Sequence, residues 1–241
     1  MYDELAEEIC SRHSDRLLDP RSPQYWIAVA GGPGAGKSTL TENLRAKINE
    51  KIGKEVSCVI PMDGYHYSRS ELKAMGDDES SEYTYEELLK RRGSPWTFNS
   101  KLLIEDLRRV KSACAGSLPI YCRKLSDPVP DGVELKGSHK IVLVEGNYLL
   151  NYKDCEWSPL EPLFDEKWYL TCESLNEQRE RLINRHLETW SDEKTRQFGA
   201  GREGAALKAD SNDMKNAIII EQNSREYADK IIISLNDEEG R

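Results

Sequence analysis

The chain lacks the features that mark several classes of protein. No apolar run approaches the ~18 residues that a transmembrane helix requires. The amino terminus, Met1 to Glu8, is acidic and has no apolar segment of the kind found in a signal peptide. No internal repeat or low-complexity stretch is evident either. We therefore expect neither a membrane protein nor a repeat architecture.

Positive net charge is lacking as well. The 241 residues include 43 acidic and 34 basic side chains, a formal net charge of −9, which disfavours nucleic acid and anionic membranes as partners. The six cysteines form no C-x-x-C pair and have no metal-like spacing with the four histidines, so we expect free thiols and a cytoplasmic location. The guanine-binding motif of GTPases, Asn-Lys-x-Asp, is also missing.

The sequence does contain a phosphate-binding motif. The run Gly31-Gly32-Pro33-Gly34-Ala35-Gly36-Lys37-Ser38, followed by Thr39, matches G-x-x-x-x-G-K-[ST]. Its glycines let the backbone turn so that successive N–H groups face phosphate oxygens. Lys37 can reach the β- and γ-phosphates of a nucleotide, and the Ser38 hydroxyl can bind Mg²⁺. Residues 31–39 are therefore our predicted nucleotide-binding site.

Short apolar runs predict an α/β fold. Five of them read as buried strands: 26–30, 56–60, 140–144, 167–170 and 230–234. Helical segments separate the runs, a pattern typical of a parallel sheet with helices on both faces. We expect helices over 1–18, 38–51, 84–92, 100–113 and 174–190, and a mobile loop over the polar, glycine-containing stretch 191–206. The chain is predicted to form one domain, 1–241, with an insertion at 64–138.

Acidic residues follow two of the predicted strands. Asp63 comes after the second strand and Glu145 ends the third. Because ligands bind outside the carboxyl ends of parallel strands, both carboxylates should lie near the phosphates. We predict Asp63 as the base that deprotonates an acceptor hydroxyl, and Glu145 together with Ser38 as the Mg²⁺ site. The alternative is that these carboxylates merely cap helices.

Basic side chains cluster on the predicted helix that starts at Ser174. Arg181 and Arg185 are one turn apart and can face one anion. We predict an arginine-bearing lid over about 179–206, with Arg185 taking part in catalysis; the alternative is a solvated face paired with glutamates. His66, three residues after Asp63, is either a substrate contact or a structural histidine.

The ordered motifs resemble those of the uridine kinase, phosphoribulokinase and bacterial-type pantothenate kinase family of P-loop small-molecule kinases. The resemblance covers roughly residues 24–235. Its motifs are residues 31–39, 61–66, 91–98, 119–123 with 127–130, 144–149, and 212–216. It implies an adenylate-kinase-like core with a five-stranded parallel sheet, ATP as donor, and Asp63 as base. It also implies that Tyr121 and Arg123 are substrate-side residues, and that residues 212–216 lie near the nucleotide base.

The acceptor pocket departs from that of uridine kinases. Gly64, Tyr65 and His66 stand where those enzymes have Ser and an aromatic residue, and the aromatic–histidine pair that follows their Tyr-Asp is missing after Tyr121. We therefore predict an ATP-dependent kinase for a hydroxyl of a small metabolite. The alternatives are a uridine or cytidine kinase, and a regulatory P-loop nucleotide-binding or NTPase module. The oligomeric state is left open.

Overall fold

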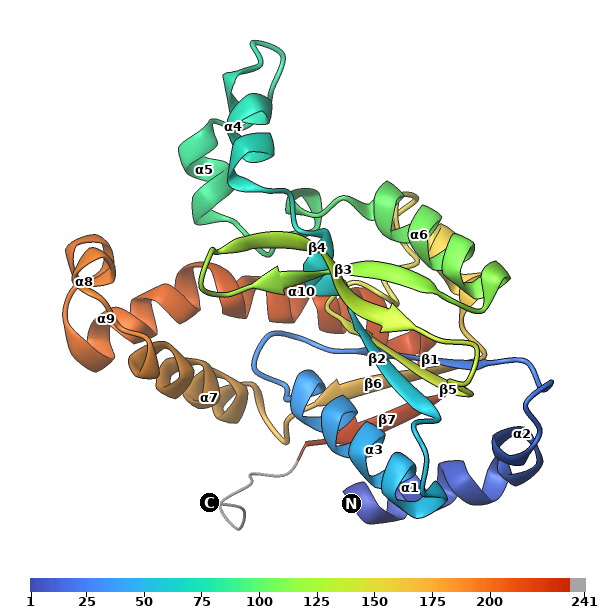
Figure 1. Cartoon of the computed structure of the whole chain (residues 1–241). Helices are drawn as coiled ribbons and strands as arrows, with labels where there is room; N and C mark the ends of the chain where they lie inside the picture. Colours follow the sequence, from blue (N-terminus) through green and yellow to red (C-terminus); the bar gives the residue numbers. More distant parts are fainter. Residues whose placement is uncertain (235–241) are drawn as a thin grey trace.

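The computed structural model describes residues 1–234 of the protein. Its central sheet has five parallel strands in the order β2-β5-β1-β6-β7 (Figure 1). The strands are Tyr25–Ala30 (β1), Ser57–Pro61 (β2), Ile141–Gly146 (β5), Glu166–Thr171 (β6) and Lys230–Ile233 (β7). Each strand overlaps one of the five predicted runs, so the predicted α/β fold with a five-stranded parallel sheet is confirmed.

Helices cover both faces of this sheet. On one face, α1 (Tyr2–Arg12) and α3 (Lys37–Ile52) pack against strand residues such as Ile27. The three apolar residues that predicted α3 are buried there: Leu40, Leu44 and Ile48. Each stabilises the fold by roughly 1.5–3 kcal/mol relative to an exposed position. The predicted helix over 1–18 is broken at His13, and Ser14–Leu18 forms a separate helix, α2.

The other face is covered by α6 (Ser100–Ala113) and α10 (Met214–Ser224). Side chains from both helices join the alternate residues of β1 and β5 in a second core. The two cores lie on opposite sides of the same strands because successive strand side chains point to opposite faces. All of these strands end in the same direction, which places the loops after β1, β2 and β5 at one edge of the sheet.

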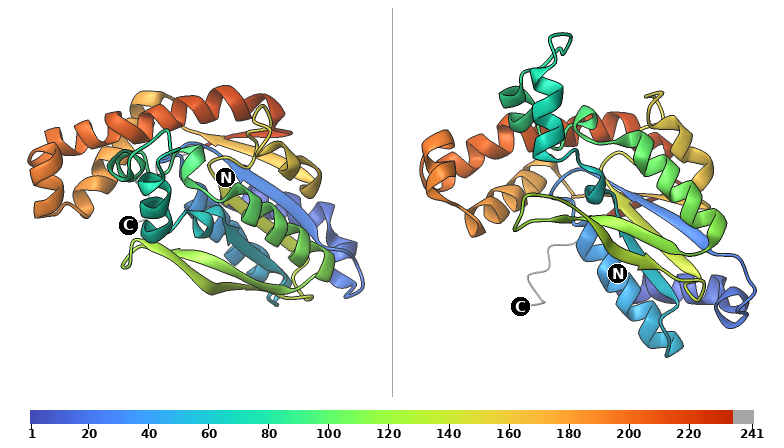
Figure 2. Two further views of the ribbon diagram at one scale, coloured as in Figure 1. Left: turned by 90° about the horizontal axis from the view of Figure 1, so that it is seen from above. Right: turned by 45° about the horizontal axis from the view of Figure 1, so that its top comes forward.

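The predicted insertion contains more regular structure than the sequence pattern indicated. Besides α6, it holds α4 (Arg69–Asp77) and α5 (Tyr85–Lys90), which project beyond the sheet (Figures 1 and 2). It also holds an antiparallel hairpin of β3 (Gly116–Cys122) and β4 (Asp127–Leu135), which we did not predict. Prolines in both strands obscured the alternation that identifies a strand. The hairpin packs on the core through Leu118 and Leu135.

The segment between β6 and β7 is mostly helical. Helix α7 spans Leu175–Glu188, and the loop predicted over 191–206 is wrong, because α8 (Asp192–Phe198) and α9 (Gly201–Lys208) occupy that stretch. The Ser191 side chain caps α8, and Ala205 of α9 packs on α7. A π-helical turn, Ala209–Asp213, then leads into α10. Figures 1 and 2 show α8 and α9 at the end of the molecule reached by α7.

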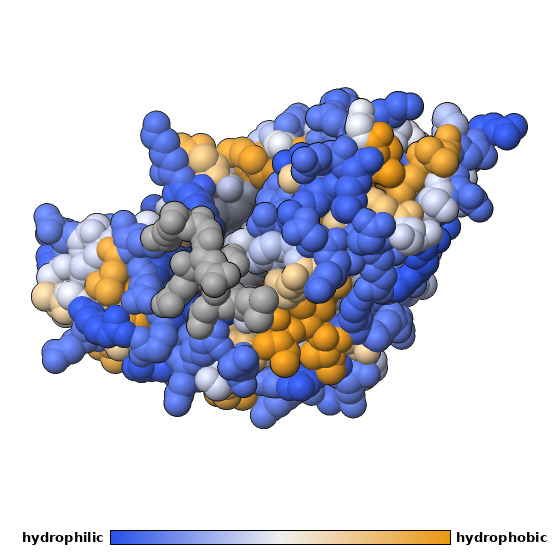
Figure 3. Space-filling model, turned by 90° about the horizontal axis from the view of Figure 1, so that it is seen from below, coloured by the Kyte–Doolittle hydropathy of each residue, from blue (hydrophilic) through white to orange (hydrophobic). Residues whose placement is uncertain are grey.

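The surface is largely polar. Figure 3 shows a mostly hydrophilic face interrupted by separate apolar patches. No helix within residues 1–234 is long and apolar enough to cross a bilayer. The six cysteines form no disulfide, as we expected.

Candidate active site

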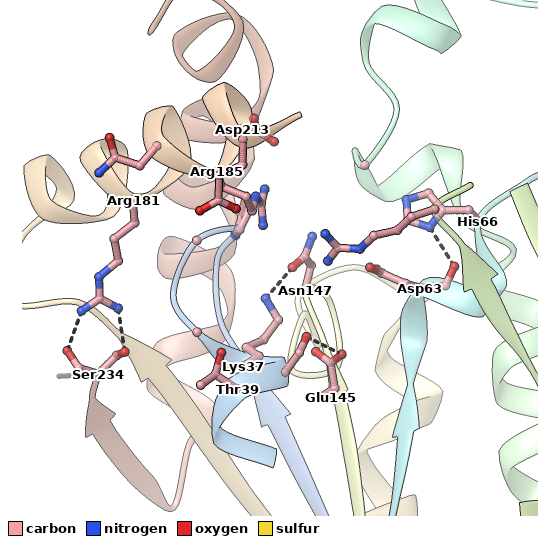
Figure 4. Close-up of a pocket in the computed structure, with 18 of the residues that line it drawn as sticks. Lys37, Thr39, Asp63, His66, Glu145, Asn147, Arg181, Arg185, Asp213 and Ser234 are labelled. Atoms are coloured by element: carbon pink, nitrogen blue, oxygen red, sulfur yellow. Dashed lines mark hydrogen bonds between the residues drawn. The ribbon is translucent and has the colours of Figure 1, made fainter. Parts of the chain in front are cut away.

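A cleft of about 970 Å³ opens where the strands β1, β2 and β5 end. Figure 4 shows that its lining side chains come from the P-loop, from the loops after β2 and β5, and from α7. The lining includes Gly34, Gly36, Lys37, Ser38, Thr39, Asp63, His66, Arg92, Gly93, Arg123, Glu145, Asn147, Arg181, Arg185, Asp213 and Ser234. Most of the predicted site residues are therefore brought together in one cavity.

The P-loop backbone has the geometry of an anion cradle. Gly34 and Gly36 have φ angles of +82° and +91°, which side chains other than glycine rarely adopt. The amides of residue 34 and of residues 36–39 find no hydrogen-bond acceptor among residues 1–234. These unsatisfied N–H groups lie at the amino-terminal end of α3, where the helix dipole also favours negative charge. The loop therefore fits the phosphates of a nucleotide.

Lys37 is buried at the centre of this cradle. Its Nζ donates to the carbonyl oxygens of Gly31 at 2.8 Å and Gly32 at 3.1 Å, and to Oδ1 of Asn147 at 2.8 Å. Burial lowers the pKa of Lys37, while the charges of Glu145 and Asp63 act in the opposite direction. Both carboxylates are thus close enough to influence the ammonium group. Asn147 was not among our predicted site residues.

The predicted magnesium ligands contact each other. Ser38 Oγ donates to Glu145 Oε1 at 3.0 Å, and Glu145 is buried. Burial raises the pKa of Glu145 to about 6, with Asp63 adding to the shift and Lys37 opposing it. Hydroxyl and carboxylate oxygens suit Mg²⁺. The described residues contain no cluster of three or more His, Cys, Asp or Glu side chains that could hold a metal ion.

Asp63 lies on the other side of the cleft from the P-loop. It belongs to the short 3-10 helix Met62–Tyr65, which directly follows β2. His66 lines the cleft beside it, and its Nδ1 lies 2.9 Å from the Asp63 carbonyl oxygen (Figure 4). Burial lowers the pKa of His66, which favours the neutral imidazole. The position of Asp63 after β2 agrees with the prediction, and its role as base stays a prediction.

Two residues in or next to the hairpin, Tyr121 and Arg123, were predicted to contact the substrate, and they differ in their position relative to the cleft. Arg123 lines the cleft, and no residue of the described chain bonds to its guanidinium. Tyr121 does not line it. Its ring lies 5.1 Å from that of His66 and 5.4 Å from the guanidinium of Arg92. Tyr121 therefore packs against two residues of the cleft wall, His66 and Arg92, without lining the cleft itself, and its predicted contact with substrate stays a prediction.

Arg92 also lines the cleft, although it was not among our predicted site residues. Its guanidinium donates to the carbonyl oxygens of Tyr67 and Ser126 and to the carboxylate of Asp127 at 3.0 Å. The side chain thereby ties the start of the insertion to the hairpin turn. The resemblance already included the motif at 91–98, which was the available signal.

The arginines of α7 and α9 divide into two groups. Arg185 and Arg181 line the cleft, in agreement with their one-turn spacing. Arg181 donates to Ser234 Oγ at 2.7 Å (Figure 4). It also donates to Glu177 at 2.6 Å. Arg179 of α7 and Arg202 of α9 do not line the cleft; Arg179 pairs with Asp210, and Arg202 pairs with Glu180. Arg179 and Arg202 are therefore held in ion pairs outside the cleft.

Residues of the 212–216 motif connect α7 to the insertion. Asp213 lines the cleft and lies 2.7 Å from Nε2 of His186 on α7. On the other side, Asn212 donates to the Arg92 carbonyl oxygen at 2.8 Å, and Asn216 accepts from Ser94 at 3.0 Å. Asn216 is buried. Asn212 and Asn216 therefore hold the insertion in place, whereas Asp213 is the residue of these three that lines the cleft.

Comparison with known proteins places these features in context. No protein-family model matches the chain. A Schizosaccharomyces pombe protein named "putative uridine kinase" is 35% identical over 226 residues, covering 92% of this chain and 86% of that protein. A pantothenate kinase of Latilactobacillus sakei is 26% identical over 182 residues, covering 70% of this chain and 55% of that enzyme.

A solved structure extends the similarity to three dimensions. It is named a "putative fructose transport system kinase" from Silicibacter and is 27% identical to this chain. The TM-score is 0.76, with 96% of this chain and 98% of that chain covered. The similarity therefore includes the sheet, the insertion and the helices that follow β6.

Proposed function

Because the chain belongs to the family of P-loop small-molecule kinases that includes uridine kinase and pantothenate kinase, we propose that it transfers the γ-phosphoryl group of ATP to a hydroxyl of a small metabolite. The observation that carries this proposal is the two-ended cleft. Lys37 and unsatisfied P-loop amides form one end, while Asp63, His66 and Arg123 form the other. Donor and acceptor can thus be held facing each other, as phosphoryl transfer requires.

Each end has a separate chemical role. Asp63 accepts the proton of the acceptor hydroxyl as its oxygen attacks the γ-phosphorus, and the bond to the β-phosphate oxygen breaks to release ADP. Lys37 and Arg185 place positive charge beside the transferring group. Ser38 and Glu145 would hold Mg²⁺, which neutralises charge on the phosphate oxygens when bound.

The six unpaired cysteines support a cytoplasmic location.

The acceptor end favours an anionic or polyhydroxy compound. Arg123 has no carboxylate partner among residues 1–234 and lines the cleft. An unpaired guanidinium beside a substrate site is suited to a carboxylate, a phosphate or several hydroxyls. The name of one relative, the Schizosaccharomyces pombe protein, favours a nucleoside instead, and this is the alternative. A kinase specific for uridine would have to build its base pocket from other insertion residues.

The proposal is tested by measuring ADP release with a panel of acceptors. The panel should contain uridine, cytidine, pantothenate, several sugars and glycerate, at fixed ATP and Mg²⁺. We expect an acidic or polyhydroxy compound to stimulate ADP release and the two nucleosides to be poor acceptors. Efficient turnover of uridine at micromolar KM would establish the alternative. ADP release that is equally fast without any acceptor would indicate an NTPase module.

Arg123→Ala tests the acceptor end directly. We expect the KM of the best acceptor to rise about 10-fold, because a charge-assisted hydrogen bond is lost, while the KM of ATP changes little. Initial-rate kinetics with each substrate varied in turn would measure both values. Lys124→Ala is the matched control, since Lys124 is the exposed neighbour that does not line the cleft. Equal effects on the two KM values would count against contact with the acceptor.

The lid is tested by hydrogen exchange. We expect amides in 191–206 to exchange more slowly when a non-hydrolysable ATP analogue, Mg²⁺ and the best acceptor are added, because closure would pack α8 and α9 against the bound phosphates. The amides of α6 serve as an internal control, since this helix lies away from the cleft. Unchanged exchange in 191–206 with every ligand bound would argue against a lid.

A further inference from the structure

Asn147 completes the hydrogen bonding of Lys37. An ammonium group has three N–H donors, and the structure provides three acceptors for them: the carbonyl oxygens of Gly31 and Gly32, and Oδ1 of Asn147. Of these three, Asn147 alone contributes a side chain. Because an ammonium group cannot accept a hydrogen bond, the amide atom that it contacts must be the oxygen. This contact sets which way the amide of Asn147 faces.

The amide nitrogen of Asn147 consequently faces away from Lys37. Asn147 lines the cleft, and Figure 4 shows it between Lys37 and the side that carries Asp63. Nδ2 carries two N–H donors, and no residue within 1–234 accepts a hydrogen bond from it. The side chain is only half-buried, so a ligand in the cleft can reach these donors.

The backbone around Asn147 holds the amide in place. Gly146 pairs with Ala30 at the start of the P-loop, and a Cβ at Gly146 would lie 2.4 Å from Met62. On the other side, Tyr148 is fully buried and its hydroxyl donates to the Gly93 carbonyl oxygen at 2.7 Å. A donor fixed in this way loses little freedom when a ligand binds, which is the property of preorganised electrostatic catalysis.

We propose that Asn147 is a further catalytic residue, whose Nδ2 donates a hydrogen bond to the γ-phosphoryl group while Oδ1 holds Lys37. This inference rests on the proposed function. The γ-phosphoryl oxygens accept hydrogen bonds and gain charge during transfer, so a fixed N–H donor stabilises them. The acceptor hydroxyl is the poorer partner, because its attacking lone pair must point at phosphorus.

Two substitutions separate the two faces of the amide. Asn147→Asp keeps an oxygen for Lys37 and replaces the donor with an anionic oxygen, whereas Asn147→Ala removes both faces. We expect Asn147→Asp to lower the preference for the ATP analogue AMPPNP over ADP by about 10- to 100-fold, because the donor to the γ-phosphoryl group becomes a repelling charge. Asn147→Ala should lower this preference to a smaller extent. Isothermal titration calorimetry with Mg²⁺ and each nucleotide measures the preference.

The control is Asn176→Asp, which adds the same charge on an exposed position of α7 and should leave the preference unchanged. If Asn147 only positioned Lys37, Asn147→Asp would retain the wild-type preference while Asn147→Ala lost it, and that result overturns the inference. If the wild-type protein binds ADP and AMPPNP, this result supports the nucleotide site whatever the Asn147 variants show. Wild-type protein that binds neither overturns the proposed function and this inference with it.

Discussion

Replacing Lys37 with alanine is expected to abolish nearly all phosphoryl transfer, a loss of at least about 10³-fold in kcat with the best acceptor. Lys37 is the only lysine that lines the cleft among residues 1–234, and it lies in the phosphate cradle. Because the transferring group gains charge in the transition state, loss of this cation raises the barrier more than it weakens binding. Single-turnover measurements of ADP formation would report the chemical step.

The fold of the Lys37→Ala variant should survive. Lys37 is buried at a desolvation cost, which is why its pKa is lowered, and it fills no apolar core. The far-UV circular dichroism spectrum and the melting temperature should therefore match those of the wild type. Lys54→Ala is the matched control, because Lys54 is exposed and lies beyond the end of α3. Near-wild-type turnover by Lys37→Ala would refute the kinase assignment.

Replacing Asp63 with asparagine should slow the reaction by about 10²- to 10⁴-fold, the usual cost of removing a general base. The amide keeps the shape of the carboxylate but cannot take the proton of the hydroxyl. Affinity for ATP should change little, since Asp63 lies on the acceptor side of the cleft with His66. Single-turnover rates and ATP titrations, measured on the same protein, would separate the two effects.

The outcome also distinguishes the possible roles of Asp63. If ATP binding collapses while single-turnover chemistry survives, Asp63 is a ligand of the nucleotide or the metal and our assignment as base is wrong. Asp131→Asn provides a control within the insertion, because Asp131 is exposed and has a positive φ of 54° that asparagine tolerates. This variant should behave as the wild type does.

The local parts of the fold and site were predictable because their signals lie in neighbouring residues. The P-loop is one continuous motif, and its helix and strand have apolar residues at the expected spacing. Ligands bind outside the carboxyl ends of parallel strands, and Asp63 and Glu145 lie where two predicted strands end. Their place at the cleft could therefore be predicted from the positions of the strands along the chain. In contrast, α8 and α9 were missed because such short helices have little periodicity and depend on caps and on packing against α7.

By itself, the sequence determined the α/β class, the nucleotide-binding loop and the acidic residues that face it, because each depends on contacts within a few residues or on a general rule of parallel sheets. Only the tertiary structure decided how distant side chains pair. It placed Tyr121 behind His66, joined Arg181 to Ser234, and brought Asn147 against Lys37. Arg181 and Ser234 are 53 positions apart in the sequence, and Lys37 and Asn147 are 110 positions apart. No local sequence pattern indicates which of such distant residues will come into contact when the chain folds.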